Sequence, residues 1–307
     1  MGLDSVVSTT VGQTVAVIIP AHNEERFIGS VVLRARQHGI AVIVVDDGSS
    51  DETAEIARLA GAIVVRHERN LGKGIALNTG FDKARELGAD AVVVLDGDGQ
   101  HQPGQIPAIA APVLAGQADL VVGSRYLERR NGDVPTHRAW GHWVFTRLTN
   151  LLSGVSVTDS QSGFRAFSRR ALEVMPFYSG GFSVESEMQF LAQENKLKVI
   201  EVPITIHYQD KPKRNVLVHG LLVLNGVLRL IGQHRPLLSF GLPGALALLA
   251  GLLLGIGVVH IYRTSHELAM GYALLVVTLV LMGSFSLFTG IILHSVRALL
   301  LDWKQKD

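Results

Sequence analysis

Short runs of aliphatic and β-branched residues alternate with amphipathic segments from Val15 to Gly123. The runs predict buried strands at Val15–Pro20, Ala41–Val45, Ala62–Val65, Ala91–Leu95 and Leu120–Gly123. The segments between them have helical spacing, at Glu24–His38, Thr53–Leu59 and Lys73–Leu87. Apolar strands joined by helices indicate an α/β domain whose mainly parallel sheet carries helices on both faces. Ser49 and Glu52 have the spacing of a capping box before the second helix.

Two longer apolar runs lie near the C-terminus, Leu237–Val259 and Leu268–Leu293, and neither contains Asp, Glu, Lys or Arg. Each reaches the roughly 20 residues that a helix needs to cross about 30 Å of hydrocarbon. They account for a mean hydropathy of +0.29, which is high for a soluble protein. We therefore expect a transmembrane hairpin of two helices; a pair of buried core helices is the alternative.

The charges around these runs predict an orientation. Basic residues flank both outer ends of the hairpin: Arg229, Arg235, Arg297, Lys304 and Lys306. The positive-inside rule then places both ends, and the large N-terminal domain, in the cytoplasm of an integral cell membrane protein. Ala247, Gly251 and Gly255 form a stripe of small residues. Such a stripe lets helices approach closely, and we expect packing within the hairpin in preference to a homo-oligomer contact.

Five segments are predicted in all. They are an N-terminal tail (1–14), the α/β domain (15–210), a juxtamembrane amphipathic segment (211–236), two membrane helices (237–296) and a cytoplasmic tail (297–307). Composition narrows the partners. Lys and Arg total 28 against 27 for Asp and Glu, without the basic excess of a nucleic-acid-binding protein. The absence of cysteine excludes disulfides and cysteine-based zinc sites.

Oxygen-bearing side chains follow two of the predicted strands: Asp46 and Asp47 after the second, and Asp96, Asp98 and Gln100 after the fourth. Parallel sheets bind ligands at the carboxyl ends of their strands. Two carboxylates and an amide suit Mg²⁺ or Mn²⁺, with phosphate oxygens completing the shell. An ordinary Asp-Gly turn is the alternative for this segment. No P-loop motif is present, and "GKGIALNTG" has the wrong spacing for a dinucleotide fingerprint.

Seven short motifs occur in order between residues 15 and 208. They read "IIPAHNEE", "VVDDGSSDET", "NLGKG", "LDGDGQHQP", "GSRY", "DSQSGFRAF" and "EVPI". Together they resemble family-2 glycosyltransferases with the GT-A (Rossmann-like) fold, which implies a mixed, mainly parallel sheet with helices on both faces. Because membrane spans follow "DGDGQHQP" and "SGFRAF", the chain looks most like the dolichyl-phosphate mannose synthases and polyprenyl-phosphate glucosyltransferases within that family.

The resemblance implies roles for individual residues. Catalytic roles would fall to Asp96, Asp98 and Arg125, and the metal would be held by Asp98, Gln100 and Asp96. The donor would be bound by Pro20, His22, Glu24, Val45, Asp46, Asp47, Lys73, Asp96, Gly97, Asp98, Arg125 and Arg214. The lipid acceptor would be bound by Arg138, Ser162, Arg165, Lys211 and Lys213. Many relatives carry R-x-x-G-x-S-K after the last strand, where this chain reads "YQDKPKRNV". Which basic residue of 211–214 meets the diphosphate stays open, and a solvated charge cluster is the alternative.

The implied reaction is inverting transfer of a hexose from a nucleotide diphosphate sugar to polyprenyl or dolichyl phosphate. GDP-mannose and UDP-glucose are both open as donors. The composition of Arg138–Leu152 and Val216–Ile231 suits helices on a bilayer surface, with packing against the domain as the alternative. A processive polysaccharide synthase is a second interpretation, although its usual Q-x-x-R-W is absent. A non-catalytic membrane scaffold is a third, against which both acidic clusters and Gln100 argue.

Overall fold

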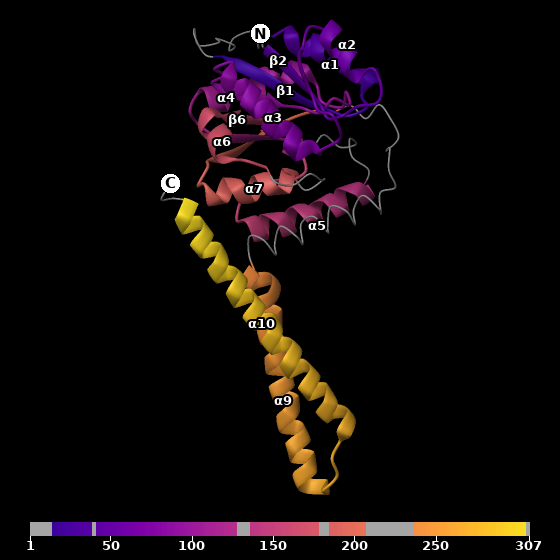
Figure 1. The fold of residues 1–307 in the computed structure, drawn as a ribbon, viewed down its shortest axis with the longest axis vertical. Coiled ribbons are helices and arrows are strands. Elements are labelled where there is room, and N and C mark those ends of the chain that lie inside the picture. The colour runs from indigo at the N-terminus through magenta and orange to yellow at the C-terminus, as the bar shows by residue number, and fades with distance from the viewer. Residues whose placement is uncertain (1–13, 39–40, 128–135, 178–183, 207–235, 305–307) are drawn as a thin grey trace. The chain divides into compact units, whose positions relative to one another are not determined.

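The computed structural model describes residues 14–38, 41–127, 136–177, 184–206 and 236–304 (Figure 1). The chain divides into two compact units, Met1–Gly226 and Val227–Asp307. The predicted boundary between residues 210 and 211, the N-terminal tail up to residue 13 and the predicted helix Val216–Ile231 all lie outside the described residues.

The first unit contains a seven-stranded sheet in the order β3-β2-β1-β4-β6-β5-β7. Its strands are β1 Val15–Ala21, β2 Ala41–Asp46, β3 Ile63–Arg66, β4 Ala91–Val94, β5 Leu120–Ser124, β6 Arg165–Ser168 and β7 Val199–Pro203. Only β6 runs antiparallel to its neighbours, β4 and β5. The predicted mixed, mainly parallel sheet is therefore confirmed. Each of the five strands predicted from the hydrophobic pattern agrees with the structure to within one residue at either end.

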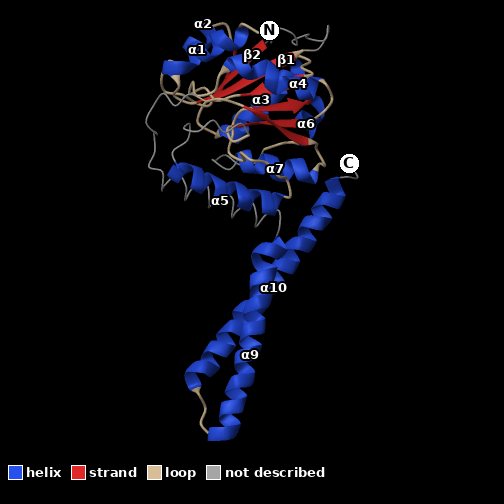
Figure 2. Ribbon diagram, turned by 180° about the vertical axis from the view of Figure 1, so that it is seen from behind, coloured by secondary structure: helices blue, strands red, loops and turns tan. Residues whose placement is uncertain are grey.

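Helices cover both faces of this sheet, as Figure 2 shows. They are α1 Glu25–Arg36, α2 Thr53–Leu59, α3 Lys73–Glu86, α4 Ile106–Leu114, α5 Thr136–Ser153, α6 Arg169–Val174 and α7 Val184–Glu194, with a 3₁₀ turn at Pro103–Gln105. Side chains alternate along each strand, so β1 sends Ile18 to one face and Val17 to the other. Residues of α3, α6 and α7 complete the core on the Ile18 face. Residues of α1, α2 and α4 complete the core on the Val17 face.

The loops after β1 and β2 cap each other's helices. Asn23 N–H donates to Ser49 Oγ (2.9 Å), and Glu24 N–H donates to Thr53 Oγ1 (2.8 Å). In the other direction, Glu52 N–H donates to Glu25 Oε2 (3.1 Å). The predicted capping box is therefore wrong: α2 begins at Thr53 and Glu52 is its N-cap residue. Ser49 instead satisfies a donor of the preceding loop, which fixes the two strand ends against each other.

The second unit is a helical hairpin. A π-helical turn at Leu237–Gly241 leads into α9 (Leu242–Ser265), and α10 spans Met270–Lys304. Both segments are long and apolar enough to cross a membrane, by length and composition, and few of their residues are buried. Of the predicted cytoplasmic tail, residues up to Lys304 continue α10. No proline or glycine follows Gly290 to end the helix earlier.

Glycines bring the two helices of the hairpin close together. A Cβ added at Gly244 would lie 2.5 Å from Leu287 N, and one added at Gly283 would lie 2.6 Å from Leu248 N. Gly251, in the predicted stripe, faces Val280, where an added Cβ would lie 3.0 Å from a side-chain methyl. The expectation that the stripe packs the hairpin is confirmed.

We expect Gly244→Ala to destabilise the hairpin by about 1–3 kcal/mol, because its methyl would overlap the α10 backbone. Gly257→Ala on the same helix is the matched control, since an added Cβ there meets nothing within 4 Å. Replacing a helical glycine with alanine at an open position is worth roughly +0.5–1 kcal/mol. Thermal unfolding in detergent should therefore shift in opposite directions, and equal shifts for both variants would contradict this packing.

Candidate active site

The predicted donor-binding residues that the structure describes gather at one edge of the sheet because the parallel strands end there. Pro20 is in β1 and His22 follows it, while Asp46 and Asp47 stand at the end of β2. Asp96 follows β4, and Arg125 follows β5. Val45 is fully buried in β2, and Gly97 is buried beside Ala21 and Ile19. The side chain of Val45 and the Cα of Gly97 therefore belong to the packed core behind this edge.

Asp47 holds the start of α3 in place. Its Oδ1 accepts from Leu71 N–H (2.9 Å) and its Oδ2 from Gly72 N–H (2.8 Å). His67 Nδ1 lies 2.8 Å from the same Oδ1. Gly72 has a φ of 94°, in the region that favours glycine, and it immediately precedes Lys73. The contacts of the buried Asp47 carboxylate are therefore within the chain, and they position Lys73.

The carboxylate of Asp46 also contacts other residues of the chain. Its Oδ1 accepts from Ser49 N–H at 3.0 Å, and its Oδ2 lies 3.0 Å from Arg66 Nε. That ion pair lacks hydrogen-bond alignment, so Oδ2 stays a buried acceptor without a hydrogen bond in the described residues. His22 is held by its Nδ1, which lies 2.9 Å from the Asp47 carbonyl oxygen.

Lys73 connects Asp96, after β4, to helix α7. Its Nζ lies 2.6 Å from Asp96 Oδ1 and 2.8 Å from Glu185 Oε1 in α7. Burial opposes the charge on Lys73, but the two carboxylates outweigh it and raise the pKa of the ammonium above its usual value. Burial likewise opposes ionisation of Asp96, but the charge of Lys73 outweighs it and lowers the pKa of that carboxyl. Asp96 is therefore an anion at neutral pH.

Asp98 lies where negative charge accumulates. Burial, then the charges of Asp96 and Glu24, raise the pKa of Asp98 to about 6, although its Oδ1 accepts from Gln100 N–H at 3.0 Å. Asp96, Asp98 and Gln100 are all partly exposed. A divalent cation would neutralise this charge, so the donor set fits Mg²⁺ or Mn²⁺. Within the described ranges no three His, Cys, Asp or Glu residues form a complete metal cage, so ligand oxygens would finish the shell.

The ring of His101 contacts the backbone of Asp96 and the ring of Phe164. Asp96 N–H donates to His101 Nδ1 (3.2 Å), and the ring packs on Phe164 with centroids 5.2 Å apart. Burial lowers the pKa of His101 to about 4; the charge of Asp96 opposes the shift, and those of Lys73 and Arg125 add to it. The imidazole is thus neutral at physiological pH, as its role as an acceptor requires.

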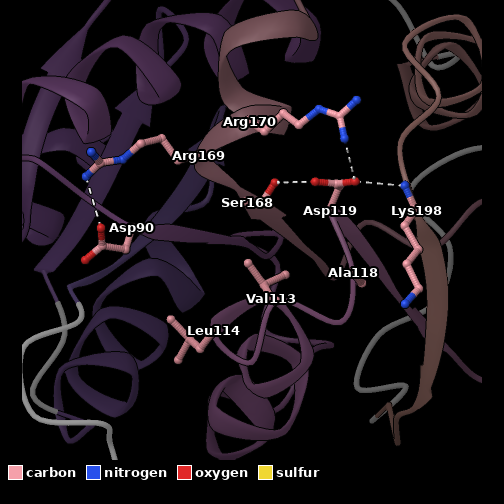
Figure 3. Close-up of a pocket in the computed structure, with 10 residues that line it drawn as sticks. Asp90, Val113, Leu114, Ala118, Asp119, Ser168, Arg169, Arg170 and Lys198 are labelled. Atoms are coloured by element: carbon pink, nitrogen blue, oxygen red, sulfur yellow. Dashed lines mark hydrogen bonds and ion pairs between the residues drawn. The ribbon is translucent and has the colours of Figure 1, made fainter.

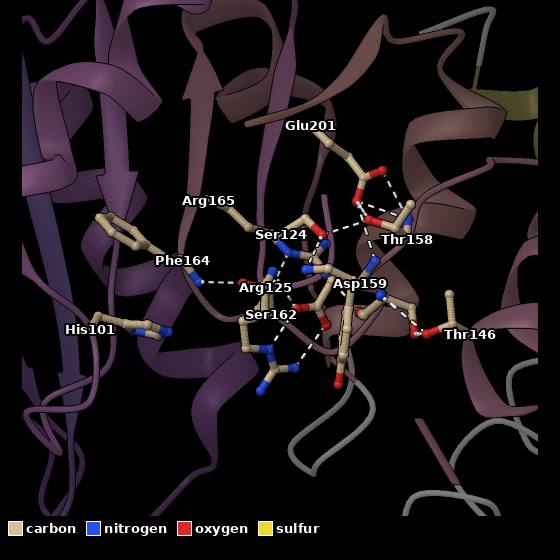
Figure 4. Close-up of polar contacts among 12 residues, drawn as sticks. His101, Ser124, Arg125, Thr146, Thr158, Asp159, Ser162, Phe164, Arg165 and Glu201 are labelled. Carbon is tan, nitrogen blue, oxygen red and sulfur yellow. Dashed lines mark hydrogen bonds and ion pairs between the residues drawn. The ribbon is translucent and has the colours of Figure 1, made fainter. Parts of the chain in front are cut away.

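The segment between α5 and β6 packs directly against the acidic cluster. A Cβ added at Gly163 would overlap Asp96 Oδ2, so a larger residue would force that carboxylate to move from Lys73. Arg125 forms a fork on the buried Asp159, with Nε 2.6 Å from Oδ2 and the second nitrogen 2.8 Å from Oδ1 (Figure 4). Thr158 N–H donates to both oxygens of Glu201 at 2.8 Å, which ties this segment to β7.

Ser162, in this segment, and Arg165, the first residue of β6, were predicted to bind the acceptor, and both are buried. The guanidinium of Arg165 is fully buried and donates to the carbonyl oxygens of Ser162 and Ser160, both at 2.8 Å (Figure 4). Arg165 Nη1 lies 3.3 Å from Met188 Sδ. These contacts are within the chain, so Arg165 braces the segment that carries Gly163 and presents no charge at the surface.

The remaining predicted residues are not described. Lys211, Lys213 and Arg214 lie in the range 207–235, and the side chain of Arg138 is outside the described part of α5. Four residues that pattern reasoning missed belong to the site: His101, Gly163, Glu185 and Glu201. The first two lie within the motifs "DGDGQHQP" and "SGFRAF", and Glu201 lies in "EVPI". Glu185 has no local signal, because its partner Lys73 is 112 residues away.

A separate surface pocket of about 470 Å³ lies at the opposite edge of the sheet (Figure 3). It is lined by residues next to the amino ends of β4, β5 and β7, among them Asp90, Asp119 and Lys198. Arg169 and Arg170 are paired there with Asp90 and Asp119. None of the predicted site residues lines this pocket, and its arginines pair with its aspartates. The candidate active site is therefore the carboxyl edge of the sheet that carries Asp96 and Asp98, called the acidic edge below.

Residues 16–175 match the family described as Glycosyl transferase family 2, which is more than half of the chain. The chain belongs to this family, and it is a glycosyltransferase. It is 38% identical over 214 residues to UDP-N-acetylglucosamine–dolichyl-phosphate N-acetylglucosaminyltransferase of Methanococcus voltae, covering 63% of this chain and 85% of that protein. It is 33% identical over 202 residues to undecaprenyl-phosphate mannosyltransferase of Micrococcus luteus, covering 62% and 82%.

Among solved structures, glucosyl-3-phosphoglycerate synthase from Mycobacterium tuberculosis, in complex with Mn²⁺, uridine diphosphate and glucosyl-3-phosphoglycerate, is similar. The TM-score is 0.57 at 25% sequence identity, covering 71% of this chain and 80% of that one. The first unit therefore has the GT-A fold. That neighbour combines the fold with a metal and a nucleoside diphosphate, the ligand class for which the acidic edge has a suitable donor set.

The pKa of His101 predicts a pH effect on stability. Its value is about 4 in the fold and 6.5 in the unfolded chain, so between these pH values only the unfolded chain binds the proton. Proton binding by the unfolded chain therefore lowers the free energy of unfolding as the pH falls from about 6.5 toward about 4, and has little effect above about pH 6.5. Relative to His101→Gln, the wild type should lose about 2 kcal/mol between about pH 7 and about pH 5. Parallel thermal unfolding curves measure the difference, and an unchanged gap would contradict a buried neutral His101.

Proposed function

We propose that this glycosyltransferase moves a hexose from a nucleotide diphosphate sugar to a polyprenyl or dolichyl phosphate, giving a polyprenyl-phosphate hexose. The observation that carries the proposal is the Asp96–Asp98–Gln100 cluster at the strand ends, in a chain that also has two helices of membrane-span length. Relatives named for dolichyl-phosphate and undecaprenyl-phosphate acceptors support the acceptor class.

The chemistry needs charge stabilisation more than proton removal. The second pKa of a phosphate monoester is near about 6, so the lipid phosphate is largely dianionic at neutral pH and is already a nucleophile. Mg²⁺ or Mn²⁺ held by Asp98, Gln100 and Asp96 would supply Lewis-acid stabilisation of the departing diphosphate. The guanidinium of Arg125, held at the same edge in an ion pair with Asp159, would be a further group positioned to stabilise the departing diphosphate. Because the dianionic phosphate needs no deprotonation, no residue is assigned as a general base. Direct attack opposite the leaving group inverts the anomeric configuration.

The donor sugar is mannose or glucose in this proposal, carried by GDP or UDP. N-acetylglucosamine is a second candidate, since a relative with 38% identity is named for UDP-N-acetylglucosamine. A panel of radiolabelled nucleotide sugars, supplied with polyprenyl phosphate and extracted into organic solvent, separates these donors. The size of the extracted product also separates single transfer from processive synthesis.

In the described part of α5, three small polar side chains face inward and two large apolar side chains face outward, where the exposed Arg147 lies over the ring of Trp143. Thr146, Thr149 and Ser153 are buried, and Thr146 Oγ1 lies 2.9 Å from Ser160 Oγ. On the outer side Trp143 is 57% exposed and Leu151 is 80% exposed. A soluble helix normally has the opposite arrangement, whereas a helix on a bilayer surface turns its apolar residues outward. We propose that α5 lies on the cytoplasmic membrane face, where the lipid phosphate is presented.

Replacing Asp98 with Asn should lower product formation by about a hundredfold or more, because the cation loses a charged ligand of the diphosphate site. Asp82→Asn is the matched control: Asp82 is exposed on α3 and pairs only locally, with Arg85. Chelation of the wild type should abolish transfer, and Mg²⁺ or Mn²⁺ should restore it. A folded Asp98→Asn enzyme with full activity would refute the metal assignment. A scaffold, in contrast, would bind no nucleotide sugar in a cation-dependent way.

The membrane role of α5 has its own test. The double variant Trp143→Gln/Leu151→Gln should raise the KM for long-chain polyprenyl phosphate in vesicles tenfold or more, because the helix loses about 2–4 kcal/mol of apolar contact with lipid and about 1.4 kcal/mol is a factor of ten. The KM for a short, water-soluble prenyl phosphate should be unchanged. Leu59→Gln is the control, since Leu59 is 79% exposed on α2. Equal losses with both acceptors would show that α5 serves the fold and not the membrane.

A further inference from the structure

Lys73 is shared by two carboxylates from distant parts of the chain. Its ammonium contacts Asp96 Oδ1 at 2.6 Å and Glu185 Oε1 at 2.8 Å. Asp96 follows β4, whereas Glu185 is in the first turn of α7. The side chains of Lys73 and Asp96 are about one-third exposed, and that of Glu185 is only 10% exposed. A glutamate that is buried this far carries a desolvation cost that a partner must offset.

The surrounding chain holds Glu185 at this place. Gln161 Nε2 donates to Ser186 Oγ at 3.2 Å, which ties the first turn of α7 to the segment that carries Gly163. The buried guanidinium of Arg165 lies against Met188, one turn further along α7. The position of Glu185 is thus fixed by the same segment that packs against Asp96.

Charge balance gives this contact a consequence. With Asp96 alone, Lys73 would form a neutral pair at 2.6 Å and would weaken the attraction of that carboxylate for a cation. Glu185 adds a second negative charge to the same ammonium, so the three side chains together carry one net negative charge. Opposite charges at such short range are felt strongly at a partly buried site, so the net charge beside Asp96 affects cation affinity.

We propose that Glu185 is a positioning residue for the cation site: it shares the charge of Lys73, so that Lys73 orients Asp96 without cancelling its charge. The inference rests on the metal site of the proposed function and adds to it a residue that does not touch the cation. Glu185 acts through Lys73, whose ammonium it contacts at 2.8 Å.

The test is a double-mutant cycle read by Mn²⁺ binding to the full-length protein in detergent, with and without UDP and with no sugar donor. The electron paramagnetic resonance signal of free Mn²⁺ reports the dissociation constant. Glu185→Gln keeps the shape of the side chain and removes its charge, and it should raise this constant about three- to tenfold. Lys73→Met in the same background removes the opposing charge, so the double variant should bind Mn²⁺ more tightly than Glu185→Gln does, although it lacks the ammonium that orients Asp96.

Glu86→Gln is the matched control, because Glu86 pairs with Lys83 at the other end of α3; its dissociation constant should equal that of the wild type. Recovery in the double variant identifies charge balance, since two purely structural defects would add. If Glu185→Gln binds Mn²⁺ as the wild type does, or if the double variant binds no better than Glu185→Gln, the inference fails and the metal site stands. If the wild type itself binds no Mn²⁺ even with UDP, both are overturned.

Discussion

The ion pair between Lys73 and Asp96 connects the elements that meet at the carboxyl edge of the sheet in the first unit. Asp47, at the end of β2, accepts the N–H groups of Leu71 and Gly72 and so fixes where α3 begins. Lys73 is the first residue of that helix, and its ammonium reaches both the end of β4 and the start of α7. Three elements that are remote in the sequence therefore meet through one side chain. Without that positive charge, Asp96 and Glu185 would repel each other across the site.

The same edge shows how a protein holds several like charges together at partial burial. Burial, and then the neighbouring charges of Asp96 and Glu24, raise the pKa of Asp98 to about 6. Next to these carboxylates, the neutral His101 accepts a hydrogen bond from the backbone of Asp96, and Lys73 pairs with the Asp96 carboxylate. Such a site is poorly satisfied by the chain alone and favours a ligand that brings both a cation and phosphate oxygens.

Much of the fold followed from local patterns. A buried strand needs a short apolar run and a helix needs apolar residues at helical spacing, so the first five strands and three helices were predictable without tertiary information. β6 and β7 were not predicted as strands; Arg165 and Glu201, which they carry, break the apolar runs and are matched by partners elsewhere in the fold. The capping box failed for a similar reason, since the partner of Ser49 is Asn23, in the preceding loop.

The sequence by itself determined the α/β class, the two apolar helices and the acidic strand ends, because each depends on residues adjacent in the chain. Family motifs also marked Arg125 and Arg165, but not what they contact. Only the tertiary structure decided that Arg125 pairs with Asp159, that Arg165 is a buried brace and that Glu185 meets Lys73. These contacts depend on how elements pack, and a charged side chain looks the same in sequence whether it meets a ligand or another part of the chain.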